Sequence, residues 1–431
     1  MLVYIKNGYV IDPGSAIEGK YNILIRDNLI QRIVAHSDAD IDNIKADKVI
    51  DASGMLVMPG LIDLHVHLRE PGYEYKETIK TGSMAAAAGG FTTICAMPNT
   101  NPALDRPDMV KFVLKKAQDA LVNIHPIGAI TLEQQGNELT DIPALIDAGA
   151  IGLSEDGKSL IDTALYAKAM EEASKLDIIV FAHCEDKSLA GNGAINAGKK
   201  AEELGLAGIS NAVEDIIVAR DIILARKTGT RLHLCHCSTK GSTEMLEIAK
   251  NKGIRVTGET CPHYFTLSDE DIPGDDSNYK MNPPLRSPRD VDAIIDALKN
   301  DVLDVIATDH APHSQEEKDK SMAEAPFGIV GLETAFSITY SELVKSGILT
   351  YRQLVEKMSL NPAKILGIDR GCIGEGKVAD IVIVNPDEEY IIDKNKFASK
   401  SANTPFHGRR VYGRVKYTIV AGEVKYEYVG L

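Results

Sequence analysis

The sequence predicts an α/β protein built around a (β/α)8 barrel of the TIM type. Between about Met55 and Leu366, short runs rich in Ile, Val and Thr alternate with longer helical patterns, which is typical of βαβ units and a parallel sheet. Eight such runs are present, and polar residues gather at their ends, where the active sites of these barrels lie. A doubly wound open sheet is the alternative, but no Gly-x-Gly-x-x-Gly follows an early strand.

The predicted elements alternate along this middle part of the chain. The strands are Leu61–His67, Phe91–Met97, Asn123–Ala129, Ala150–Glu155, Ile178–Cys184, Arg231–His236, Arg255–Cys261 and Asp304–Thr308. The helices between them include Asp105–Ala120, Ser159–Leu176, Glu214–Thr228, Ser242–Lys252 and Ser287–Asn300. A strand and a helix in each unit are what a barrel of this kind requires.

Both ends of the chain show short strand patterns separated by turns. Residues 6–8 and 26–28 are predicted to be hairpin turns. Near the C-terminus, a strand over 379–384 is expected to stop at 385–387, and a hairpin to turn at 421–423. Because chain termini often lie close together, we expect both ends to form one small β-sandwich. This divides the chain into residues 1–54 and 369–431, which form the sandwich, and residues 55–368, which form the barrel.

Composition limits the kinds of binding partner and the cellular compartment that we expect for the protein. The chain has 431 residues, of which 44% are hydrophobic, enough for a large barrel and an accessory unit. The formal net charge of −15 argues against a nucleic acid or an anionic membrane as partner. No apolar run approaches the ~20 residues of a membrane-spanning helix, and the N-terminus lacks a signal-peptide pattern. The six cysteines form no Cys-x-x-Cys pair, so we expect a reducing, cytoplasmic setting.

The strand that begins at Leu61 ends in a pair of histidines, His65 and His67. Residues two apart on a strand project from the same face, so both imidazoles can reach one divalent metal ion. Such a pair also occurs as two buried polar residues. Further ligands at the ends of other strands are needed to decide between these interpretations.

Other predicted strands supply polar residues at the same ends. They are Asn99, Asp156, His183, His236, His263, Asp309 and His310. A barrel brings these ends into one ring, so the set predicts a metal site, although each member alone could be a core or turn residue. His263 and His310 are expected to be core residues or to support a ligand. Imidazole and carboxylate ligands favour zinc, with manganese or cobalt as alternatives, and suit two ions bridged by one carboxylate.

Three longer motifs carry a resemblance to a known family. They are Asp63–Gly72, Ala96–Thr100 and Ala307–His313. With the ring of candidate ligands, they make the chain similar to the amidohydrolase superfamily and, within it, to the bacterial type I class of dihydroorotases. The resemblance covers essentially the whole chain. The motif Cys261–Phe265 is also familiar from hydantoinases and allantoinases.

The resemblance implies a site for two zinc ions. The implied ligands are His65, His67, Asp156, His183, His236 and Asp309. The first two histidines would hold one ion and the other two histidines the second. Asp156 would bridge the ions, where many relatives use a carboxylated lysine; Lys158 is not expected to be a ligand, and a one-zinc site is the alternative. Asp309 would complete the first site and act as the general acid and base.

The resemblance also implies a reaction and a substrate pocket. The reaction is the reversible cyclisation of N-carbamoyl-L-aspartate to L-dihydroorotate plus water, a step of de novo pyrimidine (UMP) biosynthesis, with metal-bound hydroxide as the nucleophile in the hydrolytic direction. Arg69 would bind the substrate's α-carboxylate as a two-pronged donor. The implied substrate-binding residues are Arg69, Asn99, Asn282, His313, Phe327 and Gly328.

Two other functions are open. The first is another cyclic amidohydrolase, such as a hydantoinase or allantoinase, but their substrates lack the carboxylate that Arg69 would bind. The second is an inactive dihydroorotase-like scaffold for aspartate transcarbamoylase, which would be expected to have lost metal ligands; all six are present. A homodimer is expected, and association with aspartate transcarbamoylase is open.

The stretch Ser314–Ser321 is charged and nearly free of apolar residues. A solvated loop is one interpretation. Because the stretch follows Asp309 closely, a mobile lid over residues 314–325 is the other.

Overall fold

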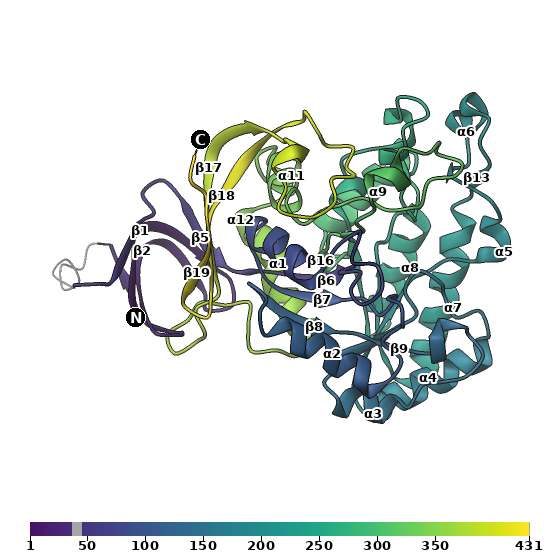
Figure 1. Cartoon of the computed structure of the whole chain (residues 1–431), viewed down its shortest axis with the longest axis horizontal. Coiled ribbons are helices and arrows are strands. Elements are labelled where there is room, and N and C mark those ends of the chain that lie inside the picture. The colour runs from purple at the N-terminus through teal and green to yellow at the C-terminus, as the bar shows by residue number, and fades with distance from the viewer. Residues whose placement is uncertain (37–44, 431) are drawn as a thin grey trace.

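The computed structural model describes residues 1–36 and 45–430, which form a mixed α/β fold with parallel sheets (Figure 1). One parallel sheet has the order β16-β15-β14-β11-β10-β9, and another has the order β6-β7-β8. Their strands are β6 (Leu61–Val66), β7 (Phe91–Ala96), β8 (Asn123–Pro126), β9 (Gly128–Ala129), β10 (Gly152–Ser154), β11 (Ile179–Ala182), β14 (Arg231–Leu234), β15 (Val256–Thr260) and β16 (Val305–Ile306). Each predicted strand overlaps at least one of these.

The two parallel sheets are linked at both of their ends. Only Ile127 separates β8 from β9, and its N–H donates to the Ala96 carbonyl of β7. At the other end, a parallel bridge joins Val66 of β6 to His310, which follows β16. The series of pairings therefore begins and ends on β6, and it brings the carboxyl ends of its strands together.

Helices follow most of these strands. The longer ones are α1 (Ile79–Ala88), α2 (Pro107–Ala117), α3 (Ile142–Asp147), α4 (Thr163–Lys175), α7 (Ala212–Thr228), α8 (Lys240–Asn251) and α9 (Pro288–Lys299). Of these, α2, α4, α7, α8 and α9 overlap the five helices that the sequence predicts. Their ends carry ordinary capping signals: Asp162 accepts from the first N–H groups of α4, and Gly229 ends α7 in the left-handed conformation. Shorter elements are α5 (Lys187–Ala190), β12 (Ile195–Asn196), α6 (Lys199–Leu204), β13 (Gly208–Ile209), α10 (Gln315–Lys318), α11 (Ala335–Thr339), α12 (Tyr351–Val355) and α13 (Asn361–Leu366).

Strands from both ends of the chain form one eight-stranded sheet, seen in Figure 1 as purple and yellow strands side by side. The strands are β1 (Leu2–Asp12), β2 (Ile17–Arg26), β3 (Leu29–Ala35), β4 (Lys48–Asp51), β5 (Leu56–Pro59), β17 (Ile381–Ile391), β18 (Arg410–Val420) and β19 (Glu423–Glu427). The two ends meet where β17 pairs antiparallel with β5. Side chains from both ends, such as Ile5, Ile383 and Ile419, share one buried cluster.

One predicted turn and one predicted strand end are wrong. Residues 6–8 lie inside β1, where the register with β2 shifts between Ile5 and Gly8 and Asn7 has φ 65°. A Cβ on Gly8 would lie 2.5 Å from Val57 Cγ2, so this glycine serves a bulge and a close approach of β5, not a hairpin. Likewise, β17 continues through 385–387 with an irregular register. The hairpins at 26–28 and 421–423 are confirmed, since they join β2 to β3 and β18 to β19.

Along β6 the alternation of side chains sets up the site. Ile62 and Leu64 pack in an apolar cluster, while Asp63 and His65 alternate with them and share the opposite face. Among the residues that the structure describes, no helix is long and apolar enough to span a membrane.

Candidate active site

Asp63 fastens β6 to the segment after β16. Its Oδ1 accepts from the His65 and Thr308 N–H groups at 3.0 and 3.2 Å, and its Oδ2 accepts from the Thr308 hydroxyl at 2.6 Å. Because Asp309 follows Thr308 directly, this buried carboxyl sets the position of two predicted metal ligands. The sequence offered one signal for it, an acidic residue in an apolar strand.

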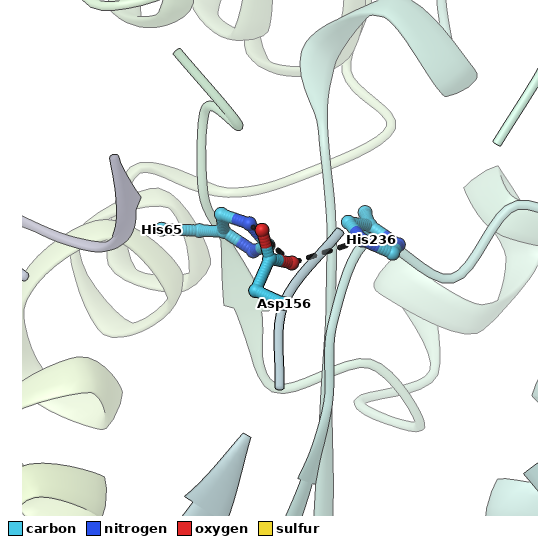
Figure 2. A group of neighbouring side chains, drawn as sticks. All are labelled: His65, Asp156 and His236. Carbon is cyan, nitrogen blue, oxygen red and sulfur yellow. Dashed lines mark ion pairs between the residues drawn. The ribbon is translucent and has the colours of Figure 1, made fainter. Parts of the chain in front are cut away.

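Asp156, two residues beyond β10, lies at the centre of the predicted ligands. Its Oδ1 is 3.2 Å from His65 Nε2, 3.6 Å from His183 Nδ1 and 3.9 Å from His236 Nε2. Its Oδ2 is 3.5 Å from His67 Nε2. Figure 2 shows the carboxylate between two of these rings, His65 and His236. One carboxylate therefore contacts all four predicted histidine ligands, as a bridging ligand would.

Asp309 completes the cluster on the side of the first histidine pair. Its Oδ1 lies 3.1 Å from His67 Nε2 and 3.6 Å from His65 Nε2. The backbone of Asp309 has φ 48°, and that of His236 has φ 35°. Such conformations are rare for residues other than glycine and gather at functional sites. The structure thus brings all six predicted ligands together, two of them in strained backbone conformations.

The carboxyls and imidazoles of this cluster perturb one another. Burial alone would raise the pKa of Asp156, but the neighbouring His65 and His67 outweigh it and hold this pKa well below its usual range. The pKa of Asp309 is lowered in the same way. Burial and the facing His183 lower the pKa of His236 to about 3. Ionised carboxylates next to a neutral imidazole are the forms that bind metal ions.

The donor set fits a divalent metal ion. The buried atoms His65 Nε2 and Asp156 Oδ1 have no hydrogen-bond partner among the described residues, although buried polar atoms normally have one. Both belong to triads of ligand atoms that lie within 4.8 Å of one another, His65 with Asp156 and His236, and His65 with His67 and Asp309. Imidazole nitrogens with carboxylate oxygens are ligands that zinc accepts.

The second ring nitrogens of two histidines are held by polar side chains. His67 Nδ1 lies 2.8 Å from Asn99 Oδ1, and His183 Nε2 lies 3.2 Å from Glu185 Oε2. Since these oxygens only accept, both nitrogens carry hydrogen, and His67 Nε2 and His183 Nδ1 are the nitrogens that face Asp156 and would bind a metal ion. Asn99 also donates to Asp156 and keeps a second amide hydrogen for a ligand.

Arg69 lies beside this cluster, as the sequence predicts for a residue two positions beyond His67. Its Nε donates to the Pro312 carbonyl at 3.2 Å. Burial lowers the pKa of Arg69, against the opposing effects of Asp309 and Asp156. Its Nη2 is 3.5 Å from His313 Nε2. The guanidinium is thus held in place at its Nε atom by the Pro312 carbonyl.

His313 is held in its neutral form next to Arg69. Its Nε2 donates to the Phe327 carbonyl at 2.8 Å, and its Nδ1 accepts from Lys76 Nζ at 3.3 Å. Burial, with the charges of Arg69 and Lys76, lowers the pKa of His313 to about 2. A substrate carboxylate at this place would therefore meet the charge of Arg69, not of His313. The sequence did not point to Lys76, whose role depends on a partner far along the chain.

Two further predicted substrate contacts, Asn282 and Gly328, already form hydrogen bonds within the protein. Asn282 donates to Glu185 Oε1 at 3.0 Å, which connects it to His183. The Gly328 N–H donates to the Lys280 carbonyl, and its own carbonyl accepts from Lys318 and Asn403. The polar groups of Gly328 are therefore occupied within the protein, which makes it a poorer ring contact than expected.

Residues 314–321 are not simply a solvated loop. Ser314 caps α10, and Lys318 at its end is only 5% exposed. Lys318 Nζ donates to the carbonyls of Lys280, Pro326 and Gly328 at 3.0 to 3.3 Å. Burial lowers the pKa of Lys318 to about 7. Lys318 therefore holds the segment after Asp309 against the backbone at residues 280, 326 and 328.

His263 and His310 do not join the ligand cluster. The His310 carbonyl accepts from the His67 N–H at 2.9 Å, and its Nε2 lies 3.3 Å from Glu77 Oε2, so this residue supports β6. The His263 ring packs on Tyr264 with 4.1 Å between ring centroids, and burial lowers its pKa to about 4.

Solved structures with the same fold are cyclic amidohydrolases. The L-hydantoinase (dihydropyrimidinase) from Arthrobacter aurescens aligns over 99% of this chain and 97% of its own, with 26% identity and a TM-score of 0.86. A D-hydantoinase aligns over 100% and 97%, with the same identity and TM-score. Together, the fold and the cluster of histidines and aspartates define the class of the protein, the amidohydrolases that act on cyclic amides.

Sequence comparison narrows this class. A family model described as Dihydro-orotase-like matches residues 54–242. A dihydroorotase from Acetivibrio thermocellus is 49% identical, over 97% of this chain and 98% of the relative. One from Clostridioides difficile is 47% identical, over 99% of this chain and the whole relative. The chain belongs to the dihydroorotase family.

Proposed function

We propose that the protein is a dihydroorotase, which interconverts N-carbamoyl-L-aspartate and L-dihydroorotate plus water in pyrimidine biosynthesis. Family membership at 49% identity over nearly the full length supports the reaction. The observation that carries the choice of substrate is Arg69, a guanidinium fixed beside the metal-ligand cluster by the Pro312 carbonyl. A carboxylate on a cyclic amide would bind there.

The proposal includes the finer architecture and the metal content. Nine parallel strands, of which β8 and β9 are separated only by Ile127 and together occupy one position, form a series that returns to β6 and supports a (β/α)8 barrel over residues 55–368. The terminal sheet supports the sandwich over residues 1–54 and 369–431, although its strand β5 (Leu56–Pro59) lies beyond residue 54. The position of Asp156 among four imidazoles supports two zinc ions with a bridging carboxylate, as in the type I class. The homodimer, the association with aspartate transcarbamoylase and the cytoplasmic location stay predictions.

The metal ions and Asp309 would carry out different parts of the reaction. When bound, the metal ions supply polarisation of the reacting carbonyl and activation of water. Asp309 accepts the proton of the attacking water on its carboxylate and delivers it to the ring nitrogen as the amide bond breaks. In the reverse direction the ureido nitrogen attacks the side-chain carboxyl, and Asp309 moves the proton the other way. Ring closure consumes one proton, so acid favours it.

The same residues would orient the substrate. Arg69 binds the α-carboxylate through its free Nη groups, and the spare amide hydrogen of Asn99 reaches the same region. Asn282 is connected through Glu185 to His183, so a ring contact there would be coupled to a metal ligand. These contacts hold the reacting carbonyl against the cluster.

A panel of cyclic amides tests the proposed function. The zinc-loaded protein should hydrolyse L-dihydroorotate and cyclise N-carbamoyl-L-aspartate, with a kcat/KM for dihydroorotate at least about 10²-fold above those for hydantoin, dihydrouracil and allantoin, because only dihydroorotate carries the carboxylate. A preference for hydantoin or dihydrouracil would assign the protein to the hydantoinase function instead.

Replacing Arg69 with methionine should mainly weaken substrate binding. A charge-assisted hydrogen bond contributes about 1.5–3 kcal/mol, so KM for dihydroorotate should rise roughly 10- to 150-fold while zinc content is unchanged. Steady-state kinetics and metal analysis measure both. Arg106, which is exposed and pairs with Asp105 and Asp108, provides the matched control R106M. An unchanged KM in R69M would remove Arg69 from the carboxylate pocket.

A further inference from the structure

A buried glutamate lies directly behind one of the predicted metal ligands. Glu259 of β15 approaches His65 of β6, with 2.9 Å between Glu259 Oε1 and His65 Nδ1. Its other oxygen, Oε2, lies 3.1 Å from Nε2 of His233 on β14. All three side chains are 0% exposed. None of the proposed binding or proton-transfer steps uses Glu259 or His233.

The contacts determine which ring nitrogens carry hydrogen. A buried carboxylate is costly unless its oxygens accept hydrogen bonds, and each oxygen of Glu259 faces one imidazole nitrogen. His65 Nδ1 and His233 Nε2 must therefore be the donors. His65 Nε2 is then the nitrogen that faces Asp156, 3.2 Å away, and that would bind a metal ion. The far nitrogen of His233, Nδ1, lies 2.8 Å from the Thr257 hydroxyl, which fixes that ring in turn.

We propose that Glu259 is a positioning residue for the metal site, held by His233 and Thr257, that fixes the ring orientation and the tautomer of His65. Glu259 binds neither metal nor substrate in this arrangement. It holds His65 through the nitrogen that faces away from the cluster and adds a negative charge behind a cation site. The inference rests on the proposed metal site.

The contacts of Glu259 indicate that it positions a metal ligand and does not merely stabilise the protein core. His65 is the ligand common to both triads of the cluster, so its orientation affects both halves of the site. His67 and His183 are held through Asn99 and Glu185, which also contact other site residues. Glu259 contacts the cluster only through His65 among the interactions described here. Loss of its carboxylate should therefore change metal affinity more than fold stability.

Zinc retention in the full-length protein tests the proposal. Zinc-loaded parent, E259Q and D12N are titrated with a chelator, and the zinc that stays bound is measured. Asp12 is the matched control: its carboxyl is also 0% exposed and accepts one N–H on each oxygen, but it lies in the terminal sheet. E259Q should release zinc at about 10- to 100-fold lower chelator concentration, and D12N within twofold of the parent. The visible spectrum of the cobalt-substituted protein should also shift in E259Q only.

A second pair of variants covers the case in which E259Q does not fold. H233Q keeps an N–H donor toward Glu259 and should retain zinc as the parent does, whereas H233L removes the donor and should lose zinc more readily. Zinc retention equal to the parent in E259Q, or equal in H233Q and H233L, overturns the proposal. A zinc loss in C235S as large as in E259Q also overturns it, since Cys235 lies close to His65 and Glu259 and would then share a separate metal with them. A parent that binds no zinc contradicts the proposed function itself.

Discussion

Asp309→Asn should lower kcat by about 10²- to 10⁴-fold, the usual contribution of a general acid and base. Asparagine keeps an oxygen in the place of the carboxylate, which lies 3.1 Å from His67 Nε2, but it cannot accept and return a proton. The kcat/KM values for ring opening and ring closure should fall by the same factor, because their ratio is fixed by the equilibrium between the two compounds, which does not depend on the enzyme. Steady-state assays in both directions measure this.

Two controls make the Asp309 result specific. Zinc content, measured on the same preparation, shows whether the variant still holds metal. D319N changes an exposed aspartate on the neighbouring segment and should leave kcat unchanged. If D309N retains more than a tenth of the parent kcat in either direction, Asp309 is not the group that moves the proton.

Asp156→Ala should abolish turnover by removing metal. Asp156 contacts four histidine nitrogens at 3.2 to 3.9 Å, and the variant lacks the carboxylate that would bridge the proposed ions. Bound zinc should fall from about two ions per chain to fewer than one, as measured by elemental analysis after desalting.

The neighbouring carboxyl provides the control for Asp156. Glu155 is also buried, but its Oε2 accepts from the Ile130 and Thr131 N–H groups, away from the cluster. E155Q should therefore keep the zinc content of the parent. Parent-like zinc content in D156A would show that Asp156 does not bridge the ions, and one zinc per parent chain would favour the single-metal alternative.

The parallel strands were predictable because each one combines a short apolar run with a helix after it. The continuation of the strands through residues 6–8 and 385–387 was not predictable, since Asn-Gly and Asn-Pro occur both in hairpins and in bulges. A hairpin and a bulge are distinguished by the neighbouring strand, as when Val57 of β5 lies next to Gly8. A local pattern does not contain that neighbour.

The candidate metal ligands follow from topology, whereas the residues that hold them do not. Histidines at the ends of several parallel strands must converge if the strands form one ring. The roles of Asp63, Glu259 and Lys76 depend on partners such as Thr308, His65 and His313, which are distant in the chain. For Asp63 and Glu259 the one trace in the sequence is an acidic residue within a strand, and Lys76 leaves none.

The sheet shared by the two ends of the chain has a consequence for synthesis. β5 pairs with β17, and the cluster around Ile5 includes Ile383 and Ile419. On the ribosome, the N-terminal strands emerge long before these partners, and until then the edge of β5 stays unpaired and open to other strands. The intervening segment can fold in the meantime, so the last strands made complete the sheet that the first ones begin.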